Sequence, residues 1–489
     1  MINACLLLLL FTLHPRYHTF EETISEVERL KLINPSIVLV ETLGYTSVLN
    51  LPIISVKISD NPSIHEPEPS FLFVGVHHAE EVLGLEVSLY TMERFVINYG
   101  IDSLITKIVN ETQLWFIPLL NADGHRIVTE GIDTTWRKNL RDNNNNGTFN
   151  PDSDGVDLNR NYSFNWSLGG SDDPTSEYYR GPAPFSENET RVIQDLAERE
   201  RFVMAIDFHS ARTGQGEIVY YPWRWGGTFC VDLPFIRSIA QLLAGSIQND
   251  AGTGTYAHLY GLATEGNFRN FLYANYGTYA YTIEISWGCI PPGERVDSIC
   301  ERVYHGLIQF INRIFGPGIA LQISDEQGNP IEAEVKILGY YDSNLPRRTS
   351  DPANGMFWKL LTPGIYDIEI TKDGFETIYL HGVTVSDTLI FRHVIIPTPK
   401  IFEHSKDNHF FISYYESGIA LKLINLFPCD ATEINVVDAT GRVLKKFFLE
   451  GKGDSSPILI KDLPSPGIFF LVIKTCKKIM CKPFIWVGR

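Results

Sequence analysis

The chain has 489 residues, a length at which about three domains are expected. Apolar residues make up 44% of it, which is typical of a globular protein and excludes an intrinsically disordered one. The formal net charge of −17 argues against a nucleic-acid-binding protein, because a phosphate-binding surface needs clustered Lys and Arg.

The N-terminus carries a short apolar run, residues 4–13. Its length fits the apolar region of a signal peptide and is too short to span a bilayer. The usual Lys or Arg before the run is missing, and no clear small-residue cleavage site follows. We therefore interpret residues 1–19 as a degraded signal peptide, with a buried N-terminal strand as the alternative. No other run is long enough for a transmembrane helix.

Strand-like runs and amphipathic stretches alternate between residues 20 and 315. The strands are expected to end at Val76, Leu120, Phe208 and Ile285, and the helices to cover 83–95 and 187–202. This alternation predicts an α/β fold with a mixed, largely parallel sheet that helices cover on both faces. Ligands of such sheets bind beyond the carboxyl ends of the strands.

Polar, metal-capable side chains follow the first of these strands. His77, His78, Glu80 and Glu81 come directly after the apolar run 71–76, where buried polar groups are costly unless something uses them. A His-x-x-Glu spacing can point one imidazole and one carboxylate at the same ion, as in a catalytic zinc site with two histidines and one glutamate. Two registers satisfy the spacing, His77/Glu80 and His78/Glu81.

Further candidates stand at later strand ends. His209 follows the run 202–208, and Glu284 is the only acid in the run 279–285. An isolated carboxylate in an apolar strand is a candidate general base. The loops in between carry three polar motifs: Asn121-Ala122-Asp123-Gly124, Trp136-Arg137-Lys138-Asn139 and Asp157-Leu158-Asn159-Arg160-Asn161.

Over about residues 20–315 the chain resembles the zinc carboxypeptidases of the A/B and T type. The matching motifs are, in order, His-x-x-Glu, Asn-x-Asp-Gly, Asp-x-Asn-Arg-Asn, a His-Ser after a strand and a strand-borne Glu. The resemblance implies one zinc ion per chain, held by His78, Glu81 and His209. It favours this register because family members often read His-His-Ala-Arg-Glu, with the second His as ligand. Asp157 would accept the distal imidazole proton of His78.

The resemblance also assigns the residues that act on the substrate. Glu284 would be the general base, and Arg137 would stabilise the tetrahedral oxyanion. Asn159 and Arg160 would bind the free α-carboxylate of a peptide through charge-assisted hydrogen bonds.

Several positions depart from the family pattern. Glu80 replaces the usual Arg of His-Ala-Arg-Glu and would place a negative charge in the peptide-binding cleft. Ala211 stands where a tyrosine is usual. A gapless count back from the strand-borne Glu puts Leu262 at the clamp tyrosine, so Tyr260 is our choice and Tyr256 the alternative.

The same count puts Arg269 at the floor of the pocket for the C-terminal side chain. An Arg there would favour Asp or Glu by direct pairing. The alternative interpretation is an exposed loop arginine.

Residues 142–154 have features of a calcium loop, with Asp142, Gly147 and Asp154 among them. Ser153 stands where a bidentate glutamate is expected, and the alternative is an Asn-rich turn that needs no metal. The seven cysteines form no complete disulfide framework, although a Cys289–Cys300 bond is conceivable.

From residue 316 the pattern changes to short strands and turns. Residues 316–398 resemble the transthyretin-like domain that often follows carboxypeptidase domains, and 399–408 has the composition of a linker. Residues 409–489 form another β domain. Its motifs at 438–442 and 466–474 resemble the C-terminal sorting domains of the type IX secretion system, which implies a secreted or cell-surface protein. Because both β regions carry their own alternating patterns, we expect residues 20–315 to fold without them.

The sequence therefore predicts a secreted zinc metallocarboxypeptidase that acts on peptide or protein C-termini, with no nucleic-acid partner and no membrane span. One alternative is a zinc amidase or peptidoglycan peptidase of the same fold, because a diaminopimelate carboxylate would also satisfy Asn159 and Arg160. Another is a non-catalytic adhesion or binding protein, against which the intact ligands and base argue.

Overall fold

The computed structural model describes residues 13–212, 214–225, 228–262, 266–397, 400–404, 410–415, 418–423, 431–450, 458–460, 463, 467–474 and 479–486. The chain divides into two compact units. The first comprises residues 1–324, 329–370 and 379–394, and the second comprises 325–328, 371–378 and 395–489.

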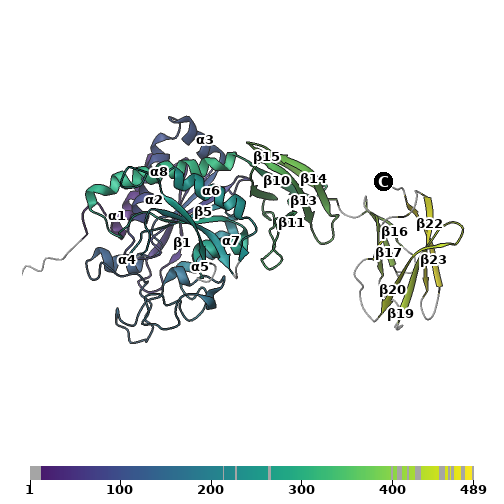
Figure 1. The fold of residues 1–489 in the computed structure, drawn as a ribbon, viewed down its shortest axis with the longest axis horizontal. Helices are drawn as coiled ribbons and strands as arrows, with labels where there is room; N and C mark the ends of the chain where they lie inside the picture. Colours follow the sequence, from purple (N-terminus) through teal and green to yellow (C-terminus); the bar gives the residue numbers. More distant parts are fainter. Residues whose placement is uncertain are drawn as a thin grey trace, which may run out of the picture. The chain divides into compact units, whose positions relative to one another are not determined.

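The first unit is built on a nine-stranded sheet (Figure 1). The strand order is β1-β2-β4-β3-β5-β9-β6-β7, with β8 paired to β6. Its strands are β1 (Val38–Tyr45), β2 (Pro52–Ile58), β3 (Ser70–Gly75), β4 (Gln113–Ile117), β5 (Met204–His209), β6 (Ile218–Trp225), β7 (Thr228–Phe229), β8 (Ala257–Leu262) and β9 (Tyr279–Glu284). The central strands β4, β3, β5 and β9 are mutually parallel, whereas β1, β2 and β6 pair with their sheet neighbours β2, β4 and β9 antiparallel. The expected mixed, largely parallel sheet is confirmed.

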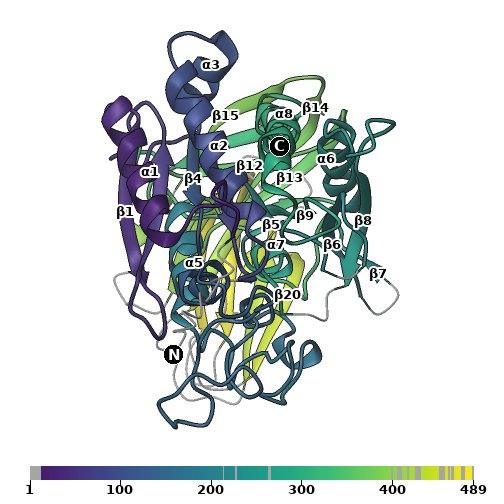
Figure 2. The same ribbon diagram turned by 90° about the vertical axis from the view of Figure 1, so that its left-hand side faces the viewer.

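Helices cover both faces of this sheet. They are α1 (Phe20–Ile33), α2 (Leu83–Asn98), α3 (Ser103–Glu111), α4 (Ala122–Thr129), α5 (Asn188–Glu200), α6 (Leu233–Gly245), α7 (Phe268–Tyr276) and α8 (Val296–Asn312). α8 contacts both α2 and α6 on one face, and α5 and α7 lie together on the other (Figure 2). Short 3₁₀ turns are η1 (Leu158–Arg160), η2 (Trp166–Leu168), η3 (Gly293–Arg295) and η4 (Arg313–Phe315).

The apolar run of β3 has no polar face because both of its sides are buried. Phe71 lies against Phe310 of α8, with ring centroids 6.3 Å apart. Leu72 and Val74, which point the other way, belong to the core under α5 and α7. Successive strand residues face opposite sides of a sheet, so a strand between two helical layers is apolar throughout.

A tight turn follows β3 and sets the positions of the next residues. Val76 adopts a φ of +60°, which a β-branched residue rarely does. A Cβ on Gly75 would lie 2.4 Å from the carbonyl oxygen of Pro118, so only glycine fits there. This close packing places residues 77–81 at the carboxyl edge of the parallel strands.

Two three-stranded sheets follow within β10–β15, in the orders β12-β10-β15 and β11-β13-β14. The strands are β10 (Gly318–Ser324), β11 (Glu334–Ile337), β12 (Met356–Leu360), β13 (Gly364–Thr371), β14 (Ile378–Val385) and β15 (Leu389–Ile395). Small antiparallel sheets after the α/β fold agree with the expected fold class.

The β10–β15 region is joined to the α/β fold by buried polar contacts. Arg348 donates to the carbonyls of Tyr273 and Ala274 at the end of α7, both at 2.8 Å. Lys359 pairs with Asp232 at 2.7 Å, and the side chains are only 8% and 3% exposed. Removing either Lys359 or Asp232 would leave the other buried and charged without a partner. The two regions therefore stabilise each other.

The second unit contains two four-stranded sheets, in the orders β16-β17-β18-β21 and β20-β19-β22-β23. Its strands are β16 (Lys400–His404), β17 (Phe410–Tyr415), β18 (Gly418–Leu423), β19 (Ala431–Val437), β20 (Val443–Glu450), β21 (Ile458–Ile460), β22 (Gly467–Lys474) and β23 (Ile479–Trp486). Within the expected linker 399–408, residues 400–404 form β16 and pair with β17. The motif at 438–442 is the turn between β19 and β20, in which Asp438 accepts from the backbone of Thr440 and Arg442.

The N-terminal residues 13–19 lie against the α/β fold. Arg16 contacts Glu86 at 2.6 Å and Asp297 at 2.7 Å, and the Tyr17 hydroxyl donates to the Pro291 carbonyl at 2.5 Å. The first 12 residues, which hold most of the apolar run assigned to a signal peptide, lie outside the described residues. Among the described helices, none combines the length and apolarity that a bilayer span requires.

A chain ending at Phe315 should be less stable than one ending at Pro397, contrary to the expectation from the sequence pattern. The truncation removes Lys359 and Arg348, so Asp232 is left buried without its cation. Breaking a buried pair in this way costs about 3–5 kcal/mol. Thermal denaturation of both chains measures the difference, and equal melting temperatures would show that the interface contributes nothing.

His65 provides a pH-dependent part of the same interface. Its ring contacts Asp351 of the β10–β15 region at 2.7 Å and Glu200 of α5 at 3.0 Å, and these hydrogen bonds raise its pKa to about 9. Because the folded pKa exceeds the unfolded value of about 6.5, the stabilisation is complete below that pH. It is lost as the pH rises through 9, and it amounts to at most about 3 kcal/mol.

We therefore expect the free energy of unfolding to fall between pH 6.5 and 9 in the intact chain. In His65→Gln this slope should be reduced, since a neutral amide does not titrate. Denaturant titrations at several pH values provide the measurement, and an unchanged slope in the variant would contradict the assignment.

Candidate functional site

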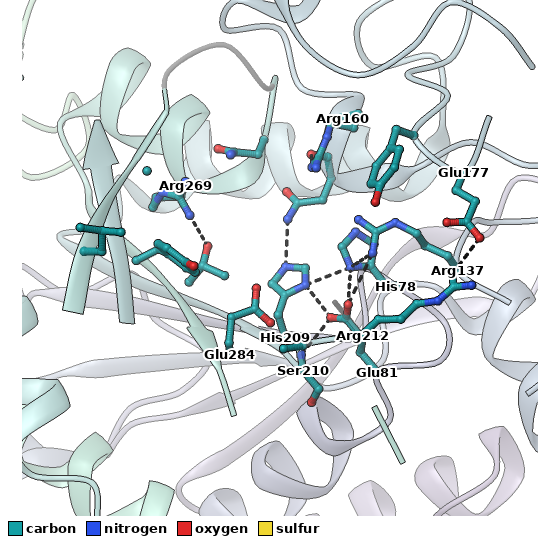
Figure 3. A pocket seen from close by; sticks show the side chains of 18 of the residues that line it. His78, Glu81, Arg137, Arg160, Glu177, His209, Ser210, Arg212, Arg269 and Glu284 are labelled. Atoms are coloured by element: carbon teal, nitrogen blue, oxygen red, sulfur yellow. Dashed lines mark hydrogen bonds and ion pairs between the residues drawn. The ribbon is translucent and has the colours of Figure 1, made fainter. Parts of the chain in front are cut away.

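The candidate side chains meet at the carboxyl edge of the central parallel strands. His209 and Glu284 are register partners at the ends of β5 and β9. His78 and Glu81 come from the turn between β3 and α2, next to β5 in the sheet. In Figure 3 Glu284 and Arg269 lie to one side of His209, and His78 and Arg137 lie to the other.

His78, Glu81 and His209 form a compact group of metal-capable atoms. His78 Nδ1 lies 2.9 Å from Glu81 Oε1, His209 Nδ1 lies 2.6 Å from Glu81 Oε2, and the two Nδ1 atoms are 3.0 Å apart. All three side chains are buried. A cation bound between the two ring nitrogens and the carboxylate would accept their lone pairs. Two histidines with one glutamate are the donor set of a catalytic zinc site. The residues therefore fit zinc.

Two buried aspartates hold the far nitrogens of the two rings. Asp157 Oδ1 lies 3.2 Å from His78 Nε2, as expected from the sequence. Asp207 Oδ2 lies 2.6 Å from His209 Nε2, a role that the sequence interpretation missed. Residues two apart in a strand point to the same side, so the Asp-x-His spacing was an available signal. Such carboxylates fix the ring orientation and tautomer of metal ligands.

The alternative register, His77 with Glu80, does not offer its atoms to the same point. His77 is fully buried, with its two ring nitrogens 2.6 Å from the Tyr162 hydroxyl and 2.6 Å from an oxygen of Asp207. His77 therefore contacts Asp207, the residue that holds the ligand His209. Glu80 is only 1% exposed and does not line the cleft, so the expected negative charge in the peptide-binding cleft is wrong.

A cleft of about 590 Å³ opens above this group. The structure brings all the predicted ligands and substrate-contacting residues to its lining: His78, Glu81, Arg137, Asn159, Arg160, His209, Tyr260, Arg269 and Glu284. Asp157 lies behind them, fully buried. The order of motifs along the chain therefore corresponds to one site in space.

Glu284 has the electrostatic surroundings of a general base. Burial and then the nearby Glu81 carboxylate raise its pKa to about 7. A carboxyl group with a pKa near the working pH can both accept and return a proton.

Arg137 is held by Asp157 beside the ligand group. Its Nε and Nη2 donate to Asp157 Oδ2 at 3.1 and 3.0 Å, and its Nη1 lies 3.0 Å from His78 Nδ1. Burial opposes ionisation of Asp157, but Arg137, Arg160 and His78 outweigh it and hold its pKa well below the usual range. A positive charge is thus fixed next to the ligands.

Asn159 and Arg160 sit in the 3₁₀ turn η1, which Asp157 caps by accepting from Asn159 N at 2.9 Å. The Asn159 amide lies 2.9 Å from His209 Nε2 and donates to Asp207 at 3.1 Å. Asn159 therefore supports the ligand His209 as well as lining the cleft. Among the described residues no carboxylate lies within ion-pair distance of Arg160, which leaves its guanidinium available to an anion.

Tyr260 and Tyr256, the two candidate clamp tyrosines, differ in position. Tyr260 lines the cleft, whereas Tyr256 is buried and donates its hydroxyl to the Ile285 carbonyl at 2.5 Å. The position of Tyr260 is therefore compatible with the clamp role, whereas the Tyr256 hydroxyl already donates to the Ile285 carbonyl.

The cleft residues that the sequence interpretation missed include Tyr178, Glu177 and Arg212. The Tyr178 ring faces both Arg137 and Arg160, with 5.4 and 5.6 Å from ring centroid to guanidinium carbon. Glu177 pairs with Arg212 at 2.9 Å (Figure 3). They lie in loops without periodic pattern, so only the tertiary structure reveals them.

The proposed calcium loop, residues 142–154, is held by its own hydrogen bonds. Asp142 accepts from Asn146 N and Gly147 N, and Asp154 accepts from Asn143 N and Asn150 N. The loop is also not among the groups of metal-capable side chains found in the described residues. Calcium is therefore unsupported.

The conceivable disulfide between Cys289 and Cys300 is not formed. Cys230, Cys289 and Cys300 are all free thiols. Cys300 is buried on α8, and Cys289 is partly exposed in the loop after β9.

Residues 23–306, more than half of the chain, match the family described as Zinc carboxypeptidase. The chain therefore belongs to this family.

Curated relatives show the same similarity at low identity. Rat carboxypeptidase A2 is 28% identical over 304 residues, which cover 60% of this chain and 68% of the relative. The catalytic chain of human carboxypeptidase N is 25% identical and covers 81% of this chain and 90% of the relative. Duck carboxypeptidase D is 25% identical over 74% of this chain, which spans only 25% of that relative's length.

Solved structures support the fold. A carboxypeptidase A from Helicoverpa armigera superposes with a TM-score of 0.53 at 23% identity and covers 60% of this chain and 73% of the other. Thrombin activatable fibrinolysis inhibitor gives a TM-score of 0.54 at 21% identity, with 61% and 76% covered.

Substitution of His78 or His209 by Ala should abolish stoichiometric zinc binding, since each removes a ligand. His77→Ala should retain one zinc per chain with affinity weakened about 10–100-fold, as for loss of a supporting contact. Metal content after dialysis against buffered zinc distinguishes them. Full zinc in His78→Ala together with complete loss in His77→Ala would move the register by one residue.

Proposed function

We propose that this member of the zinc carboxypeptidase family removes C-terminal amino acids from peptides and proteins. The observation that carries the proposal is the convergence of His78, Glu81 and His209 with Glu284 and two arginines in one cleft. A metal donor set, a carboxyl group with a near-neutral pKa and fixed cations are the parts that peptide hydrolysis at a free carboxylate requires.

Arg160 is the residue best placed to bind the substrate's α-carboxylate. It lines the cleft and carries no ion pair within the described part of the chain. A planar guanidinium binds a carboxylate through two charge-assisted hydrogen bonds. Tyr178 packs against Arg160 and Arg137 and so limits the positions of both. Tyr260 also lines the cleft.

When bound by His78, Glu81 and His209, zinc would supply a Lewis acid and lower the pKa of water to about 7. Glu284, at the end of β9, accepts a proton from the attacking water and returns it to the leaving amine. Arg137 donates to the oxygen that becomes negative in the tetrahedral intermediate, because Asp157 already holds its guanidinium in place.

Arg269 is proposed to select an acidic C-terminal residue. It is 5% exposed on α7, which excludes the exposed loop arginine considered from the sequence. Its Nη1 donates to Thr282 Oγ1 at 2.8 Å, and its guanidinium lines the cleft. A Cβ on Gly261 would lie 2.1 Å from its Nη2, so this glycine leaves the room that the guanidinium fills.

The domain roles and location are also part of the proposal. Residues 316–398 are assigned as a transthyretin-like domain, supported by two small antiparallel sheets and by a relative whose similarity covers 81% of this chain. Residues 409–489 are assigned as a sorting domain of the type IX kind, and the protein as secreted or cell-surface. Residues 1–19 are assigned as the leader for this export.

The proposed function is tested with peptides that differ only at the C-terminus, either free or amidated. Wild type should release the last residue from free-acid peptides and spare the amidated ones. Glu284→Gln should keep its zinc and fold while its turnover falls by about 10²–10⁴-fold. Near-normal turnover in that variant would exclude Glu284 as the base. Cleavage of peptidoglycan peptides alone would favour the amidase alternative, and absence of any hydrolysis by the zinc-loaded protein would favour the binding protein.

The role of Arg269 predicts a specific pattern in the same assay. Wild type should have a higher kcat/KM for peptides ending in Glu than for those ending in Leu or Arg. Arg269→Ala should lose about 10–100-fold on the Glu peptide alone, the equivalent of one or two charge-assisted hydrogen bonds. Arg212→Ala, which removes an arginine from the cleft rim, is the matched control. An unchanged ranking in Arg269→Ala would rule out the selection.

A further inference from the structure

Glu80 is a buried carboxyl group that the proposed reaction does not use. It is 1% exposed, and neither of its carboxylate oxygens has a hydrogen-bond partner in the described part of the chain. Arg137 and Arg212 act on it only through their charge, since neither forms an ion pair with it. Buried polar groups normally have partners, because an unpaired one costs free energy.

The unpartnered carboxylate belongs to a second group of metal-capable atoms. One oxygen of Glu80, one oxygen of Glu81 and the sulfur of Cys289 all lie within 4.8 Å of one another. Cys289 is a free, partly exposed thiol, and its sulfur is 3.6 Å from the Ser210 carbonyl oxygen. Neither Glu80 nor Cys289 lines the catalytic cleft.

The charges in this group favour a cation. Glu80 and Glu81 meet at Cys289, and no cationic side chain of the described residues pairs with Glu80. Burying several negative groups together is costly unless a positive charge is shared among them. Thiolate and carboxylate donors together suit zinc and other thiophilic divalent cations rather than magnesium or calcium.

We propose that Glu80 and Cys289 form a second metal site for a thiophilic divalent cation, with Glu81 shared between this site and the His78–His209 group. On binding, the sulfur–hydrogen bond of Cys289 is replaced by a sulfur–metal bond, and the proton passes to solvent.

The shared ligand implies an effect on the first site. A cation at the second site would share the Glu81 carboxylate with the first site. It would also place a positive charge beside the catalytic group. We expect it to reduce peptide hydrolysis, a consequence that rests on the proposed function. Metal binding itself does not depend on that function and is measured separately.

The test is a titration of the full-length, zinc-loaded protein with Cd²⁺ under reducing conditions. Equilibrium dialysis gives the number of bound ions, and ultraviolet absorption detects the charge-transfer band of a cadmium–thiolate bond. The His78, Glu81 and His209 group contains no sulfur, so exchange of zinc for cadmium there produces no such band. Wild type should bind two metal ions per chain and develop the band.

Matched variants assign the site. Cys289→Ser should lose the band and the second ion but keep the first. Glu80→Gln, which preserves the shape of the side chain, should keep the first ion and bind the second at least tenfold more weakly. Cys230→Ser removes a buried thiol elsewhere and should behave as wild type. Added Cd²⁺ should inhibit the wild type more strongly than Cys289→Ser, because exchange at the first site affects both proteins equally.

Three outcomes would overturn the proposal. They are a wild type with one ion and no band, a band that persists in Cys289→Ser, and an unchanged second affinity in Glu80→Gln. Loss of the first ion from wild type would instead contradict the proposed function, so the two failures are distinguishable.

Discussion

The site depends on keeping several ionisable groups buried together at one edge of a parallel sheet. His78, Glu81 and His209 are all buried, and isolated charges in such a place would be prohibitively costly. Each ring is therefore held at its far nitrogen by an aspartate, Asp157 or Asp207. The arrangement fixes both imidazoles with their other nitrogens facing a common point, so that a cation completes the charge balance.

The same aspartates connect the ligands to the substrate-binding residues. Asp157 holds both His78 and Arg137, and Asp207 holds His209 while accepting from Asn159. Metal binding and substrate binding therefore use one hydrogen-bond network rather than two independent sets. A change to either aspartate is expected to disturb both functions together.

Most of the β10–β15 region belongs to the same compact unit as the α/β fold. Lys359 and Arg348 reach Asp232 and the end of α7, the helix that carries Arg269. The β region thus supports the element that bears the proposed specificity residue. Because of this coupling, we expect that the boundary drawn at residue 315 from the sequence pattern does not mark an independent folding unit.

The sequence alone predicted the fold class from local patterns, and it predicted the group of metal-capable residues from strand ends together with the resemblance to a known family. The apolar run before His77 and the acid within 279–285 mark strand ends, and parallel strands bring their carboxyl ends to one edge. The His-x-x-Glu spacing allowed two registers, and the structure distinguished them because the ring of His77 is held by Tyr162 and Asp207.

Other features were decided only by tertiary packing. The burial of Glu80 beside Cys289, the docking of Lys359 on Asp232 and the placement of Tyr178 join residues far apart in the chain. No periodicity or spacing reports such contacts, because they depend on how loops of irregular conformation pack. The position of Arg269 was expected from a count along the chain, but its burial against Thr282 is a property of the folded protein.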